Sequence, residues 1–274
     1  MNSATSTPSK AFVPHDSWIT RGVSVLLWSI NLAWMIPSML LLTAIWKAVP
    51  VRRTEWLTRL QCRVQIALTG CKWRAIVHPD VDPKRSYLFL QNHTNHFDYA
   101  VMANATPHPL QGVELEKHFK YPVYGWFMKA RGTIPIKQGS ATANKDLGDR
   151  MKRELERGMS ILLFPEGTRT LDGRLGPLRR GAFHMALQLG VPIVPVTVTG
   201  MYETMHKGSL LIRPGYTVTV HVDKPIETTA LNKRDVPALM EQVRTVMSNH
   251  IDAYWQKQSE QQALETAQSG VQSG

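Results

Sequence analysis

The sequence predicts an α/β fold, in which a largely parallel sheet is flanked by helices and preceded by an N-terminal hydrophobic membrane helix or helical hairpin. From about residue 73, short runs rich in β-branched residues alternate with helical patterns, which is typical of parallel sheets. An uncharged run covers residues 22–46, ahead of the first strand pattern. Two of the predicted strands are followed directly by polar segments, at the strand ends where α/β sheets form their sites.

The uncharged run is long enough to cross a membrane. As one helix it would extend roughly 37 Å, more than a hydrocarbon layer of ~30 Å. Pro37 lies near its middle and leaves two forms open, a spanning helix or a hairpin that enters and leaves on one side. Basic residues are more frequent after the run (Lys47, Arg52, Arg53, Arg59 and Arg63) than before it (Lys10 and Arg21), which predicts a cytoplasmic location for the rest of the chain. Residues 51–70 have the pattern of a basic amphipathic helix lying on the membrane.

The net charge of +11 requires an anionic partner. An anionic membrane and a phosphorylated substrate both account for it, and the sequence has no zinc-finger or RNA-binding signature, so no nucleic-acid partner is predicted. Cys62 and Cys71 have neither metal-ligand nor disulfide-framework spacing. We interpret them as reduced residues without a chemical role.

Six strands and two helices are expected after the membrane segment. The strands are expected at residues 73–77, 86–91, 133–137, 160–164, 192–198 and 217–222. Leu147, Met151 and Leu155 repeat at helical spacing, with Gly158 as a stop. A second helix covers residues 235–255, with one packed apolar face. The chain is expected to divide into a flexible N-terminus (1–15), a membrane-associated helical segment (16–72), an α/β domain (73–255) and a disordered tail (256–274).

The first polar segment, QNHTNHFD at residues 91–98, combines a histidine and an aspartate that could act together. Residues five apart on a helix diverge by about 140°, so His93 is expected in a loop, with a helix beginning near Asn95 and Asp98 in its first turn. Asp98 could then hold one ring nitrogen of His93 while the other takes a proton from a substrate hydroxyl. Two alternatives remain: a helix cap beside a structural histidine, or a metal site that also uses His96.

The second polar segment, FPEGTR at residues 164–169, has the groups that suit a phosphate. Gly167 and Thr168 offer backbone N–H groups and a hydroxyl, and Arg169 offers a bidentate guanidinium. Glu166 would then hold Arg169 or bind a substrate hydroxyl. Because both segments follow strands, we expect them to share one cleft. The alternative is a β-turn with a surface ion pair.

Together these segments resemble the glycerolipid acyltransferase family, and most closely its 1-acylglycerol-3-phosphate acyltransferases. Three of the family's motifs are matched: Asn-His-x4-Asp by Asn92, His93 and Asp98, Phe-Pro-Glu-Gly-Thr-Arg by residues 164–169, and apolar-Pro-Ile-apolar-Pro by residues 191–195. The second motif, Gly-x-Ile-x-Ile-x-Arg, is one residue shorter at 132–137 and ends in Lys137. The resemblance covers about residues 73–225.

The resemblance implies a glycerol-3-phosphate acyltransferase-like fold and an enzyme of phospholipid biosynthesis. Such an enzyme transfers a fatty acyl group from acyl-CoA or acyl carrier protein to the sn-2 hydroxyl of lysophosphatidic acid, giving phosphatidic acid, without a cofactor or metal. It implies His93 as the general base and Asp98 as its partner. The residues implied in substrate binding are Asn92, Lys137, Glu166, Gly167, Thr168, Arg169 and Ile193, the last as a candidate oxyanion donor. The enzyme would lie at the membrane, with its catalytic domain on the cytoplasmic face.

Three other functions stay open from the sequence. The shortened second motif is compatible with another lysolipid acceptor, such as lyso-ornithine lipid or a lysophospholipid with a larger headgroup. A non-catalytic lipid-binding protein and a metal hydrolase that uses His93, His96 and Asp98 are the remaining alternatives.

Overall fold

The computed structural model describes residues 17–137, 139 and 145–272. Its centre is a seven-stranded sheet in the order β1-β7-β6-β2-β5-β3-β4, in which only the β6–β7 pair is antiparallel. The strands are β1 (Lys72–Val77), β2 (Leu88–Gln91), β3 (Leu110–Leu115), β4 (Ile134–Ile136), β5 (Ser160–Leu163), β6 (Ile193–Thr199) and β7 (Thr217–Val222). The predicted fold class and the six predicted strands are confirmed.

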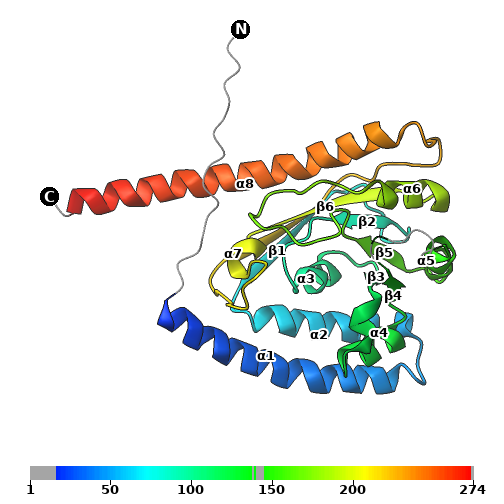
Figure 1. Cartoon of the computed structure of the whole chain (residues 1–274), viewed down its shortest axis with the longest axis horizontal. Coiled ribbons are helices and arrows are strands. Elements are labelled where there is room, and N and C mark those ends of the chain that lie inside the picture. The colour runs from blue at the N-terminus through cyan, green and yellow to red at the C-terminus, as the bar shows by residue number, and fades with distance from the viewer. Residues whose placement is uncertain (1–16, 138, 140–144, 273–274) are drawn as a thin grey trace, which may run out of the picture.

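Helices cover both faces of this sheet (Figure 1). On one face lie α5 (Leu147–Glu156), α6 (Arg180–Leu189) and α8 (Val236–Gln272); on the other lie α1 (Trp18–Ile45), α2 (Glu55–Ala67), α3 (Asp98–Ala105) and α4 (Tyr124–Arg131). Three short helical segments are η1 (Val51–Thr54) between α1 and α2, η2 (Glu116–Lys120) between β3 and α4, and α7 (Met201–Thr204) between β6 and β7. Strand β2 shows the alternation of a central strand, because Leu88 and Leu90 pack on the α8 side while Phe89 packs on the α3 side.

Strand β3 was not expected from the sequence. It reads LQGVEL, in which a glycine and two polar residues weaken the strand pattern. The buried Gln111 amide donates to Arg131 O (3.0 Å) and to Glu154 Oε2 (3.1 Å), so these tertiary contacts make a polar residue acceptable in a central strand.

The two helices predicted in the α/β domain are present, and one continues further than expected. Helix α5 buries Leu147 and Met151, and Gly158 follows it with φ +75°. Helix α8 runs from Val236 to Gln272, so the prediction of a disordered tail from residue 256 is wrong for the described residues. Residues 256–272 are rich in glutamine, glutamate and alanine, good helix formers that extend a nucleated helix at little cost. The predicted flexible N-terminus lies outside the described residues.

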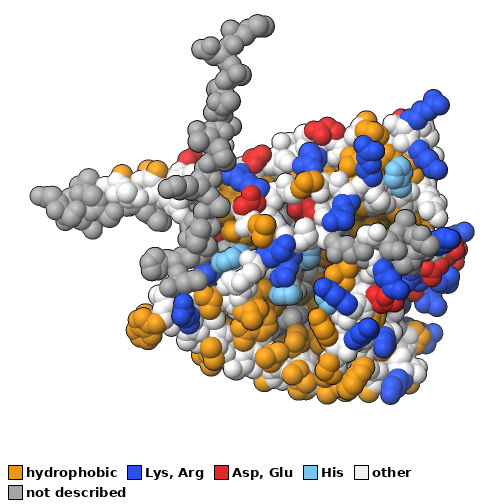
Figure 2. Space-filling model, viewed as in Figure 1, with side chains coloured by type: hydrophobic (Ala, Val, Ile, Leu, Met, Phe, Trp, Pro, Cys, Tyr) orange, Lys and Arg blue, Asp and Glu red, His pale blue; other side chains and the backbone are white. Residues whose placement is uncertain are grey.

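Helix α1 forms one continuous helix through Pro37 rather than a hairpin within the apolar run. Among the described residues, it is the helix long and apolar enough to cross a membrane. Most of its large apolar side chains are exposed: Trp18, Ile19, Val25, Leu26, Ile30, Leu32, Ile36, Leu40 and Leu41. They gather on the lower edge of the molecule in Figure 2, where α1 lies in Figure 1.

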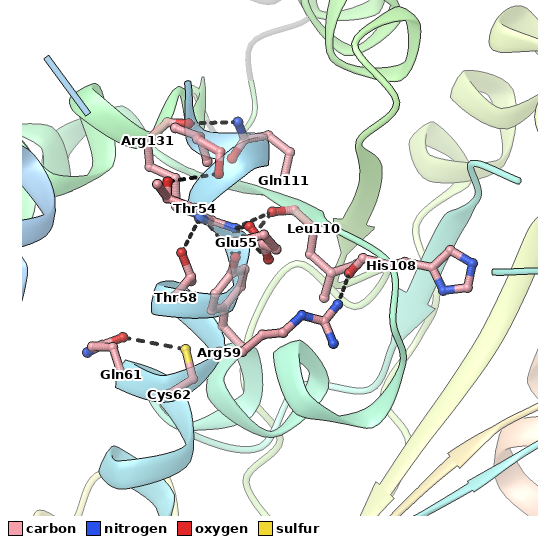
Figure 3. A network of polar contacts seen from close by, with 12 residues as sticks. Thr54, Glu55, Thr58, Arg59, Gln61, Cys62, His108, Leu110, Gln111 and Arg131 are labelled. Carbon is pink, nitrogen blue, oxygen red and sulfur yellow. Dashed lines mark hydrogen bonds and ion pairs between the residues drawn. The ribbon is translucent and has the colours of Figure 1, made fainter. Parts of the chain in front are cut away.

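Helix α2, which was expected to lie on the membrane, is held between α1 and α3 (Figure 1). A buried polar network holds it against the domain (Figure 3). The Arg131 guanidinium donates to Glu55 (3.0 Å), Thr58 Oγ1 (2.8 Å), Tyr99 OH (3.0 Å) and Leu110 O (2.7 Å). Both charged side chains are almost fully buried. This network joins α2 to α3, α4 and β3.

Both cysteines are free and buried. Burial raises the pKa of the Cys62 thiol to about 12, so this thiol stays protonated at neutral pH. The side chain packs in the core beside α3. Both thiols are reduced, as the sequence analysis predicts.

Candidate active site

The candidate site lies at the carboxyl end of the central strand β2. Its neighbours on either side are β5 and β6, both parallel to it, so the segments that follow all three strands meet at one edge of the sheet. The loop of residues 92–97 follows β2, the FPEGTR segment follows β5, and α7 follows β6. The two polar segments therefore lie together, as predicted, and α7 lies against the first of them.

His93 and Asp98 form the predicted pair. Asp98 is the first residue of α3, and its Oδ2 lies 2.7 Å from His93 Nδ1. The same carboxylate accepts the backbone N–H groups of Thr94 and Asn95 and the Thr94 hydroxyl. The carboxylate therefore caps the helix start and fixes the imidazole at once. With Nδ1–H donated to a carboxylate, the lone pair of the ring is on Nε2.

Three further contacts fix the position of His93. Its ring stacks on Phe164, with centroids 4.0 Å apart and an interplanar angle of 18°. Its backbone N–H donates to Glu166 Oε1 (2.8 Å), and its carbonyl accepts the N–H of Thr170 (2.8 Å). No described residue forms a hydrogen bond with Nε2. The site therefore presents one oriented imidazole nitrogen that can accept a proton.

Glu166 has a different role from the predicted one. It is buried, and its second oxygen accepts the N–H of Gly176 (2.7 Å), so both oxygens bind backbone N–H groups instead of Arg169 or a substrate. Burial raises the pKa of this carboxyl group, while the two N–H donors oppose that shift. Glu166 thus joins the His93 loop to the segment after FPEGTR.

Of the last three residues of the FPEGTR segment, Gly167 and Thr168 are exposed and Arg169 is partly buried. The N–H of Gly167 donates to Phe164 O (3.0 Å), and its φ of +66° favours glycine. Thr168 Oγ1 accepts a hydrogen bond from Lys207 Nζ (2.8 Å). Arg169 Nη1 lies 3.0 Å from His96 Nε2. Burial and the nearby guanidinium lower the pKa of His96, so this imidazole is neutral at pH 7 and accepts from Arg169.

Two other predicted residues do not reach the site. Asn92 exchanges two hydrogen bonds with the backbone of Val198 (3.0 and 2.7 Å), so its amide fixes the end of β2 to β6. Ile193 lies at the amino end of β6, beside Leu88 at the start of β2. Its N–H already donates to Ile226 O (3.0 Å), so the prediction of an oxyanion donor at Ile193 is wrong. The direction of β6 puts Ile193 at the end of the sheet opposite to the site, and a short motif does not reveal strand direction.

Lys137 lies at the same edge of the sheet but far to the side. It follows β4, three strands from β2, which is roughly 14 Å at about 4.8 Å per strand. Its ammonium pairs with Glu116 (3.3 Å), and both side chains are about half exposed. The structure therefore does not bring Lys137 together with His93 and Arg169.

The apolar helix α1 contacts this site directly. Trp28 stacks on Phe97, the residue before Asp98, with ring centroids 5.9 Å apart. Its indole N–H also donates to Leu210 O (2.6 Å), and Ser24 exchanges hydrogen bonds with the backbone of Ile212 (3.0 and 2.9 Å). Figure 2 shows cationic and histidine side chains in the band above the apolar edge formed by α1. The polar site therefore borders the apolar surface.

The chain is similar to known acyltransferases. The family model Acyltransferase matches residues 74–199. The chain is 42% identical over 108 residues to a chloroplastic 1-acyl-sn-glycerol-3-phosphate acyltransferase of Brassica napus, a match that covers 39% of this chain and 31% of the relative. It is 35% identical over 196 residues to the human 1-acyl-sn-glycerol-3-phosphate acyltransferase beta, covering 69% of this chain and 67% of the relative. The chain spans about a third of the length of the first two plant relatives, 31% and 36%.

The fold is similar to a solved structure. The crystal structure of the 1-acyl-sn-glycerophosphate (LPA) acyltransferase of Thermotoga maritima matches 86% of this chain and 95% of its own, with a TM-score of 0.72 and 16% sequence identity. At that identity the likeness supports the fold alone. The human relative is matched over two thirds of its length at 35% identity. These matches, together with the motifs that meet at the end of β2, show that the chain belongs to the glycerolipid acyltransferase family, among the 1-acyl-sn-glycerol-3-phosphate acyltransferases.

Proposed function

We propose that the protein transfers a fatty acyl group from acyl-CoA or acyl carrier protein to the free sn-2 hydroxyl of lysophosphatidic acid, giving phosphatidic acid. The proposal is supported mainly by the His93–Asp98 pair, which orients Nε2 of His93 beside the loop that carries the Arg169 guanidinium. The names of the relatives support the same acceptor.

In the proposed reaction His93 is the general base. Nε2 takes the proton of the acceptor hydroxyl as its oxygen attacks the thioester carbonyl carbon. The tetrahedral intermediate then collapses, the carbon–sulfur bond breaks, and the leaving thiolate takes the proton back from His93. Asp98 stabilises the imidazolium formed between these steps. A base of this kind contributes roughly 10²–10⁴ in rate, about 3–5 kcal/mol.

We propose that Arg169 binds the acceptor phosphate. It follows β5, next to the strand that carries His93, and its guanidinium is held by a neutral histidine rather than by a carboxylate. Among the described residues no carboxylate offsets the charge of this guanidinium, and it can donate to phosphate oxygens.

Replacing His96 by alanine is expected to leave kcat within about threefold and to raise KM for lysophosphatidate by about two- to tenfold, the range of one exposed hydrogen bond. His96 orients Arg169 and touches no reacting atom. Because protonation removes its acceptor, KM of the parent should also rise as the pH falls through the lowered pKa of His96. Initial rates against lysophosphatidate concentration check both effects. A hundredfold loss of kcat in His96→Ala would contradict this role.

We also propose that transfer needs no bound metal. His93 and Asp98 bind each other, the carboxylate accepts three further hydrogens from Thr94 and Asn95, and His96 faces a cation. These are poor conditions for a shared metal ion. Activity is therefore expected to survive a chelator, and stoichiometric bound metal with activity lost to the chelator would favour the hydrolase alternative.

We propose that the protein acts at a membrane surface, with α1 in the lipid and the α/β domain on the cytoplasmic face. The exposed apolar face of α1 and the basic residues that follow it support this arrangement. The contact between Trp28 and Phe97 would then hold the His93 loop beside the lipid headgroups.

The proposal is tested with membranes that contain the protein, several lysolipids, and labelled acyl-CoA or acyl carrier protein. Acylation of lysophosphatidate is expected at a rate above that of other lysolipids. Lys137, one of the residues implied in substrate binding, pairs with Glu116 and lies away from His93. The assay therefore also includes lyso-ornithine lipid and lysophospholipids with larger headgroups as acceptors. Transfer to one of them alone would overturn the acceptor. No transfer to any lysolipid would overturn the reaction.

A further inference from the structure

Lys207 is a cation beside the FPEGTR segment that belongs to none of the family motifs. It lies in the loop after α7, and its ammonium donates to Thr168 Oγ1 (2.8 Å). Arg169, the next residue after Thr168, is held by His96. We propose that Thr168, Arg169 and Lys207 form a phosphate cradle, in which Lys207 is the second cation and selects a phosphate monoester over a phosphodiester. This inference rests on the proposed function for the identity of the acceptor.

The position of Lys207 is fixed relative to the base. Asn95, one of the residues between His93 and Asp98, is buried, and its amide donates to the carbonyls of Met201 (2.8 Å) and Met205 (3.0 Å). Both carbonyls belong to α7 and its end, two to six residues before Lys207. The loop that carries His93 therefore positions the loop that carries Lys207.

Helix α1 holds the same loop from the other side. Ser24 and Trp28 bind the backbone of Ile212 and Leu210, three to five residues after Lys207. A lysine on a loop held at both ends loses less freedom when it binds an anion than one on a mobile loop. Lys207 is thus preorganised beside Thr168.

The charges in the cradle favour an anion. Among the described residues, no carboxylate forms an ion pair with Arg169 or Lys207; their hydrogen-bond partners are a neutral imidazole and a hydroxyl. A bound anion would supply the counter-charge that neither cation has among the described residues. Lys137, by contrast, already has Glu116 as its counter-charge.

The segments that carry the two cations follow the two strands on either side of β2. Arg169 follows β5 and Lys207 follows β6 through α7, and β2 with His93 lies between these strands. A terminal phosphate carries up to two negative charges and three free oxygens, which suits two cations and a hydroxyl. A phosphodiester carries one charge and two free oxygens, so it gains less from the second cation.

The test compares Lys207→Gln and Lys207→Arg with the parent and with Lys233→Gln, a control that removes an exposed lysine before α8. Lys207→Gln should raise KM for lysophosphatidate about tenfold, the value of a charge-assisted hydrogen bond, with kcat within threefold. Lys207→Arg should stay within about threefold of the parent in both constants. The rate with lysophosphatidylcholine, a diester, should change less than twofold in every variant.

A binding measurement separates this inference from the proposed function. The unfolding midpoint of each full-length variant is recorded with and without sn-glycerol 3-phosphate. Stabilisation of the parent that is reduced in Lys207→Gln supports the cradle even if no lysolipid is acylated. Acylation of lysophosphatidate with an unchanged KM in Lys207→Gln overturns the cradle and leaves the proposed function standing. A loss of kcat that Lys207→Arg does not restore also overturns it.

Discussion

Replacing His93 by alanine is expected to lower kcat for acyl transfer by about 10²–10⁴, the contribution of a general base. Nε2 is the one ring nitrogen that the surrounding loop leaves for a proton, since Nδ1 is held by Asp98 at 2.7 Å. KM for lysophosphatidate should change little, because the imidazole touches the reacting hydroxyl rather than the phosphate. The measurement is a steady-state assay of membranes with equal amounts of each variant.

Two further variants separate catalysis from folding. His184→Ala, which removes an exposed histidine on α6, should keep the parent's activity. Asp98→Asn should also lose activity strongly, because an amide cannot accept from His93, Thr94 and Asn95 together. Its unfolding midpoint is expected to fall as well, whereas that of His93→Ala should stay near the parent's. Retention of more than a tenth of the activity in His93→Ala would exclude His93 as the base.

Replacing Arg131 by alanine is expected to destabilise the protein by about 3–5 kcal/mol, because it leaves Glu55 charged and buried without its partner. Thr58, Tyr99 and the carbonyl of Leu110 would lose a donor at the same time. For a chain of this size the loss corresponds to a fall in Tm of roughly 10 °C. Thermal unfolding of the full chain in detergent, followed by circular dichroism, gives the measurement.

A matched pair on the surface provides the control. Arg85 and Glu227 form an even closer ion pair (2.6 Å, against 3.0 Å for Arg131 and Glu55), but both side chains are about half exposed. Arg85→Ala should therefore cost less than about 1 kcal/mol. A double variant, Glu55→Leu with Arg131→Met, should recover much of the stability lost in Arg131→Ala, since it leaves no buried charge unpaired. Equal losses of unfolding free energy in Arg85→Ala and Arg131→Ala would show that the buried network contributes no more to stability than a surface ion pair.

Local patterns predicted most of the α/β domain because they depend on near neighbours in the chain. Leu147, Met151 and Leu155 fixed one face of α5 by their spacing alone. The strand pattern of β3 is weak because Gln111 is acceptable there only through Arg131 and Glu154, residues far away in the sequence. The low complexity of residues 256–272 predicts disorder, whereas their helix propensity allows α8 to continue.

The α/β class, the apolar N-terminal helix, the family and the pairing of His93 with Asp98 follow from the sequence alone, because each depends on a short pattern or on residues close in the chain. The surroundings of that pair depend on tertiary packing. Strand direction put Ile193 at the wrong end of the sheet, strand order moved Lys137 aside, and backbone donors from two loops took both oxygens of Glu166. Lys207 reached Thr168 across 39 positions of sequence because β5 and β6 flank the same strand. Contacts of this kind depend on the packing of whole elements, which no motif encodes.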